Sequence, residues 1–70
     1  MTLRELREKK KLSQAEVAER GELEQTTVSQ LELGKIRDPR HSTIQKLAKV
    51  YGVRLQDVVD ALGHSVEQAA

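Results

Sequence analysis

The chain has 70 residues, of which 33% are charged, and its formal net charge is only +1. A chain of this length forms a single domain and buries only about 60% of the surface that its unfolded form exposes. It contains no cysteine, which excludes disulfide bonds and thiolate metal sites and fits a reducing, cytoplasmic location. No apolar run approaches the roughly 18 residues of a membrane-spanning helix, so no membrane contact is expected.

The small net charge hides an uneven distribution of charged residues. Residues 1–12 carry five basic and two acidic side chains, and residues 35–49 carry five basic and one acidic. Between them, residues 13–34 carry one basic and five acidic side chains. A polyanion could therefore be bound by the basic flanks. A solvated surface of mixed charge explains the same pattern.

The apolar periodicity is helical throughout, and no stretch alternates as a strand would. Pairs of Thr or Ser with Glu or Gln three residues later have capping-box spacing, which marks helix starts. We therefore predict a compact all-α domain over residues 1–62, followed by a frayed C-terminal tail over residues 63–70. The predicted helices span residues 2–10, 13–20, 24–33, 42–51 and 55–62. The predicted capping boxes are Thr2/Glu5, Ser13/Glu16 and Ser42/Gln45, and Gly63 is expected to end the last helix.

The third predicted helix has an outer face of short or amide-bearing side chains. At about 100° per residue, Val28 and Leu31 turn to one side of this helix. Its opposite side carries Thr26, Ser29, Gln30 and Leu33, with Gln25 on the flank. None of these outer residues is charged, whereas a merely solvated helix face would more often carry Glu and Lys.

Residues 14–33 read as two helices joined by a tight turn, with the small Ala18 where they cross. The joint spacing of Ser13-Gln14, Val17-Ala18, Val28-Ser29, Leu31-Glu32 and Gly34 resembles the helix-turn-helix of the Cro/repressor (XRE) family, from about residue 3 to residue 62. The resemblance implies a five-helix, lambda-repressor-like domain whose helix-turn-helix is formed by helices two and three. It also implies sequence-specific binding of double-stranded DNA by a transcriptional regulator, most simply a homodimeric repressor, with helix three in the major groove.

The resemblance implies two kinds of DNA contact. A glutamine amide can bond N6 and N7 of adenine, and a threonine methyl can pack on the thymine methyl. Basic side chains and helix N-termini bind phosphates. The implied base contacts are Gln25, Thr26, Ser29 and Gln30, and the implied backbone contacts are Gln14, Lys35, Arg37 and Arg40. An ordinary exposed polar surface is the alternative interpretation of these residues.

Two further sets of residues have structural roles in this interpretation. Arg7 and Glu32 match an ion pair that joins the first and third helices in phage repressors of the family. The last predicted helix carries more apolar side chains than inward packing needs. We therefore expect Val58, Val59 and Leu62 at a homodimer interface, with core packing as the alternative.

The chain departs from the family at two turns. Lys11 stands where the family usually has a glycine in left-handed conformation, which costs a lysine about 1 kcal/mol. The turn after helix two reads Gly21, Glu22, Leu23, where the family has an apolar residue, glycine and another apolar residue. Either Glu22 is left-handed, or Gly21 is and the turn shifts by one residue.

Functions other than DNA binding have less support in the sequence. No nucleophile elbow or phosphate-binding loop is present, and the two histidines, His41 and His64, are far apart in sequence. We therefore expect no enzyme activity, cofactor or metal. The chain could instead be the DNA-binding half of an antitoxin with a toxin partner, a domain of a longer protein, or a protein-interaction module that has lost DNA binding. The acidic Glu22 and Glu24, near the start of helix three, favour the interaction module.

Overall fold

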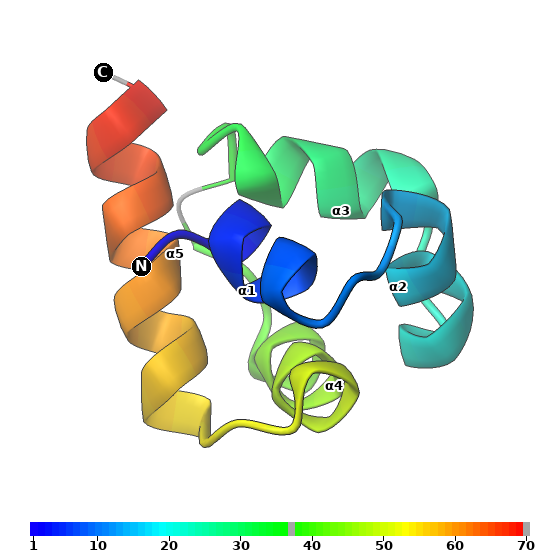
Figure 1. Cartoon of the computed structure of the whole chain (residues 1–70). Coiled ribbons are helices and arrows are strands. Elements are labelled where there is room, and N and C mark those ends of the chain that lie inside the picture. The colour runs from blue at the N-terminus through cyan, green and yellow to red at the C-terminus, as the bar shows by residue number, and fades with distance from the viewer. Residues whose placement is uncertain (37, 70) are drawn as a thin grey trace.

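The computed structural model describes residues 1–36 and 38–69, the last five of these by their backbone alone. This part of the chain folds into five helices and no strand, which confirms the predicted all-α fold (Figure 1). None of the helices described is long and apolar enough to cross a membrane. The helices are α1 (Leu3–Lys9), α2 (Gln14–Gly21), α3 (Gln25–Glu32), α4 (His41–Tyr51) and α5 (Leu55–Ala69).

Capping boxes begin the first two helices, as predicted. The Glu5 N–H donates to Thr2 Oγ1 over 3.2 Å, and the Thr2 N–H donates to Glu5 Oε1 over 2.9 Å. Ser13 and Glu16 make the same reciprocal pair over 3.0 and 3.1 Å. Each box satisfies two backbone N–H groups at a helix start.

The predicted capping box of the fourth helix is wrong. Helix α4 begins at His41 with Arg40 as its N-cap residue, and Arg40 makes no side-chain capping hydrogen bond. The Arg40 carbonyl accepts the N–H groups of Thr43 and Ile44 over 3.0 and 3.2 Å. Because the first turn closes there, Ser42 lies inside the helix and cannot cap it.

Helix α5 is longer than predicted. It runs from Leu55 to Ala69, so the expectation that Gly63 ends it is wrong. A Cβ at Gly63 would meet no atom within 4 Å. An exposed glycine inside a helix costs only about 1 kcal/mol relative to alanine, which weakens the helix but does not end it. The division of the chain into a domain and a tail at residue 62 stays a prediction.

Two turns hold non-glycine residues in the left-handed conformation. Lys11 has φ 57° and Glu22 has φ 55°, each at a cost of about 1 kcal/mol. The turn after α2 therefore uses Glu22 and not Gly21. Gly21 is buried, and a Cβ there would lie 3.3 Å from Leu23 Cδ1 and 3.4 Å from Val50 Cγ2. Leu23 and Val50 thus fill the space around this glycine.

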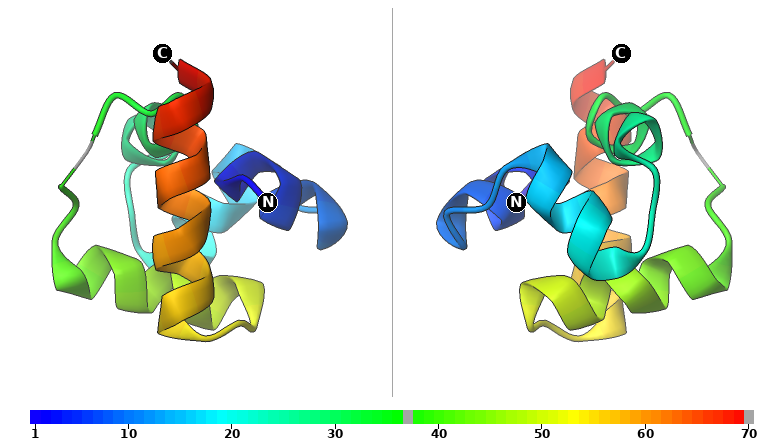
Figure 2. Two further views of the ribbon diagram at one scale, coloured as in Figure 1. Left: turned by 90° about the vertical axis from the view of Figure 1, so that its left-hand side faces the viewer. Right: turned by 90° about the vertical axis from the view of Figure 1, so that its right-hand side faces the viewer.

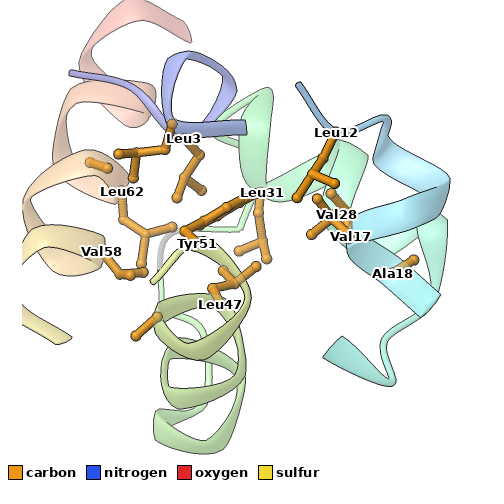
Figure 3. Close-up of a cluster of buried hydrophobic side chains, with 13 residues drawn as sticks. Leu3, Leu12, Val17, Ala18, Val28, Leu31, Leu47, Tyr51, Val58 and Leu62 are labelled. Carbon is orange, nitrogen blue, oxygen red and sulfur yellow. The ribbon is translucent and has the colours of Figure 1, made fainter. Parts of the chain in front are cut away.

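The core joins all five helices (Figure 3). Helix α2 packs against α3 and α4, and α5 packs against α1, α3 and α4. Figure 2 shows α4 lying across one end of α5 and α3 nearer the other end. Each fully buried aliphatic side chain contributes roughly 1.5–3 kcal/mol, so this core fixes α3 to the rest of the domain. Its most deeply buried large side chains are Tyr51, Leu3, Leu31, Leu47, Val17, Val28 and Val58.

Candidate nucleic-acid interface

Helices α2 and α3 form a compact pair. Ala18 is only 6% exposed, and its small side chain allows the two helices to approach closely. Val17 on α2 and Val28 on α3 are both fully buried and lie close together in the core (Figure 3). With Val28 and Leu31 held inward, the opposite side of α3 faces the solvent.

A shallow surface hollow of about 450 Å³ lies on this outer side. It gathers the four predicted base-contact residues of α3 together with Gln14 from the start of α2 and Lys35 from the loop after α3. Leu33 was not predicted as a contact and also lines it. No lining side chain is acidic, so nothing in the hollow itself repels a polyanion. The lining residues are Gln14, Gln25, Thr26, Ser29, Gln30, Leu33 and Lys35.

The predicted pair of Arg7 and Glu32 forms a two-point ion pair beside this hollow. Arg7 Nε lies 2.7 Å from Glu32 Oε2, and Arg7 Nη2 lies 3.2 Å from Oε1. Both side chains are largely buried, with exposed fractions of 14% and 5%. The hydrogen bonds to Glu32 raise the pKa of Arg7 above its usual value. Because Arg7 Nη1 also donates to the Leu12 carbonyl over 2.9 Å, one guanidinium joins α1, α3 and the segment before α2.

Gln14 is attached to the same carboxylate. Its Nε2 donates to Glu32 Oε1 over 3.0 Å, a contact that was not anticipated from the sequence. An amide nitrogen carries two hydrogens, so one remains to donate to another acceptor. The ion pair therefore fixes the direction of the Gln14 side chain at the edge of the hollow.

Of the three predicted basic contacts of the following loop, the two that the structure describes lie apart. Lys35 lines the hollow. Arg40 is exposed as the N-cap residue of α4 and does not line it. Arg37 lies outside the described residues. The geometry thus brings together Gln14 and Lys35 with the base-contact residues, and leaves Arg40 apart from them.

The prediction for the α5 interface needs correction. Val58 is fully buried and Leu62 is 8% exposed, so both belong to the core, and only Val59, at 44%, has a substantial free surface. Leu55, one turn earlier, is 40% exposed. Helix α5 packs against three other helices and therefore buries the face that carries Val58, Ala61 and Leu62, while Leu55 and Val59 face outward.

The described part of the chain offers no group of three His, Asp or Glu side chains able to hold a metal ion. His41 begins α4 and His64 lies on α5. Neither histidine lines the hollow beside α3.

Comparisons with known proteins agree with this geometry. The model of a helix-turn-helix family matches residues 3–58. The chain is also 39% identical over 62 residues to a Bacillus subtilis (strain 168) protein named "Uncharacterized HTH-type transcriptional regulator RghRB". That match covers 89% of this chain and 45% of the relative, so the chain spans less than half of the relative's length. No solved structure matches the chain.

Proposed function

Because the chain belongs to the Cro/repressor-type helix-turn-helix family, we propose that it binds double-stranded DNA at specific sequences and regulates transcription. The observation that carries the proposal is the hollow over α3. Three glutamines, a threonine and a serine line it together with Lys35. Such side chains can bond base edges and phosphates, and an α-helix fits the major groove of DNA.

In this proposal α3 enters the major groove with its N-terminal turns deepest and its outer face against the bases. Gln25 and Gln30 bond adenine through N6 and N7, and the Thr26 methyl packs on a thymine. Ser29 lies between them on the same face and bonds a neighbouring base. These contacts determine which DNA sequence the protein binds.

Gln14 and Lys35 contact phosphates and set how deeply α3 enters the groove. Gln14 stands at the first position of α2, where the helix N-terminus also favours an anion. Gln14 bonds to Glu32, and Glu32 bonds to Arg7. These bonds fix the position of the phosphate-binding Gln14 relative to α3. Arg40 extends the contact with the DNA backbone along the loop. Arg37, which is not among the described residues, is the remaining predicted contact of this kind.

The simplest regulator of this kind is a homodimeric repressor. Two copies would place their α3 helices about 34 Å apart, one turn of DNA. Leu55 and Val59 supply exposed apolar surface on α5 for this contact. A two-fold dimer requires a palindromic site. A palindrome among the bound DNA sequences would therefore support the dimer.

Selection of bound duplexes from a random pool tests the function. We expect an enriched palindrome whose binding weakens by roughly 5- to 150-fold, about 1–3 kcal/mol, for each of Gln25→Ala and Gln30→Ala. Gln45→Ala, at an exposed glutamine of α4, is the matched control and should bind as the parent chain does. Binding without enrichment would reduce the proposal to phosphate contacts. Enrichment without symmetry would remove the dimer.

A second candidate is a protein-interaction module that has lost DNA binding, whereas an antitoxin-type regulator with a toxin partner would keep it. Glu22 and Glu24 favour the module, because both are exposed at the turn before α3 and would face phosphates at a cost in affinity. Failure of the chain to bind any duplex at low salt would favour this candidate over DNA binding.

A further inference from the structure

Leu33 is an apolar side chain on the polar face proposed to bind DNA. It is 54% exposed, more than any other large hydrophobic residue in the described part of the chain. It lines the hollow over α3 and also a neighbouring hollow of about 340 Å³ beside the Arg7–Glu32 pair. Exposing a leucine gains nothing for the folded monomer, so its position suggests a contact made on binding.

The backbone around Leu33 is firmly placed. Its N–H donates to the Ser29 carbonyl over 3.0 Å. Gly34, with φ 74°, then turns the chain, and the Lys35 N–H bonds back to the Gln30 carbonyl over 3.0 Å. These bonds satisfy the carbonyls at the end of α3. Leu33 is therefore presented by the end of a helix and not by a loose loop.

The neighbours of Leu33 on this face indicate what it meets. Ser29 and Gln30 precede it by one turn, and Lys35 follows two residues later, all lining the same hollow. In the proposed complex the first two face bases and Lys35 faces a phosphate. Leu33 thus lies between base-facing and phosphate-facing side chains. The apolar group that a base presents in the major groove is the C5 methyl of thymine.

We propose that Leu33 selects a thymine by packing against its C5 methyl group. This inference rests on the proposed DNA binding and adds a base preference at the C-terminal end of α3. Leucine offers no hydrogen bond, so its selectivity comes from burying one methyl group, which cytosine lacks. Loss of one such apolar contact weakens binding by about fourfold.

A methyl-deletion scan of the bound duplex tests the inference with the whole chain. The duplex selected by the parent chain is remade with one thymine at a time replaced by deoxyuridine, which removes the methyl alone. Each duplex is titrated against the parent chain, Leu33→Ala and Leu33→Asn, the last being polar but similar in shape. Melting temperatures of the two variants, expected to match the parent because Leu33 is exposed, show that the fold is kept.

We expect one thymine position in each half-site at which methyl removal costs the parent about fourfold and costs neither variant anything. The other thymines of the same duplex are the controls, because their methyl effects should be equal in all three proteins. Equal effects at every thymine would overturn the inference and leave the proposed function intact, since the parent would still bind its selected site. No selected site at all would overturn the proposed function itself.

Discussion

Gln14 donates a hydrogen bond of 3.0 Å from Nε2 to Oε1 of Glu32. This bond joins the first residue of α2 to the last residue of α3, 18 positions later in the chain. Glu32 is at the same time held by Arg7 of α1. A residue proposed to bind phosphate is therefore linked to the fold of the domain through one buried carboxylate.

The first prediction concerns the Arg7–Glu32 pair. Arg7→Ala strands the largely buried Glu32 carboxylate and should lower the free energy of unfolding by roughly 3–5 kcal/mol. Arg4→Ala breaks only a 3.7 Å contact with Glu8 between highly exposed side chains, worth about 0.3–0.5 kcal/mol. Urea unfolding of both variants compares them. Equal unfolding midpoints would show that the ion pair does not stabilise the domain.

The second prediction concerns the two left-handed residues. Lys11→Gly and Glu22→Gly should each raise the free energy of unfolding by about 1 kcal/mol, because glycine adopts positive φ without the steric cost. For a domain of this size that corresponds to a rise of about 4–8 °C in melting temperature. Glu19→Gly, at an exposed site within α2, is the control and should destabilise by about 1 kcal/mol. If all three variants lowered the melting temperature, neither turn would be strained.

The third prediction concerns the length of α5. Gly63→Ala should raise the free energy of unfolding by about 0.5–1 kcal/mol, because Gly63 is helical and an added Cβ meets no atom within 4 Å. Gly52→Ala should do the opposite, since Gly52 ends α4 with φ 66°. Thermal unfolding measures both. Destabilisation by Gly63→Ala would mean that the helix ends at this glycine after all.

The fourth prediction concerns acid stability. The backbone hydrogen bond from Ser13 lowers the pKa of Glu16 below its ordinary 4.5, and that from Thr2 does the same for Glu5. A carboxylate with a lowered folded-state pKa stabilises fully above the unfolded pKa and loses that contribution as the pH falls through the folded value. Stability should therefore fall below about pH 4.5, and Glu16→Gln should make this fall shallower. Glu19→Gln, inside the same helix, is the control. If Glu16→Gln left the fall of stability at low pH unchanged, the capping role of that carboxylate would be contradicted.

Features of the fold that depend on residues close together in the sequence were easier to predict than features that depend on distant residues. The capping boxes of α1 and α2 join residues three positions apart, and the sequence predicted both, although the equally local box predicted at Ser42 and Gln45 is wrong. The sequence left open whether Gly21 or Glu22 is left-handed, and Gly21 packs near Val50, which lies 29 positions away in sequence. The burial of Val58 depended on how α5 crosses the other helices.

The same distinction applies to the candidate site. The outer face of α3 follows from helical periodicity, so its four predicted residues do lie together with Gln14 and Lys35 in the hollow. The bond between Gln14 and Glu32 joins two helices, and no local sequence pattern predicts it. Helical periodicity puts Leu33 on the outer face, but the role proposed for it depends on its neighbours in the hollow.

The proposal that DNA lies on the α2–α3 face is tested most directly by the glutamine side-chain amides in an NMR titration. The amide signals of Gln14, Gln25 and Gln30 should shift on addition of the selected duplex, while those of Gln45 on α4 and Gln56 on α5 should not. Shifts confined to Gln45 and Gln56, or no shift with any duplex, would contradict the proposal.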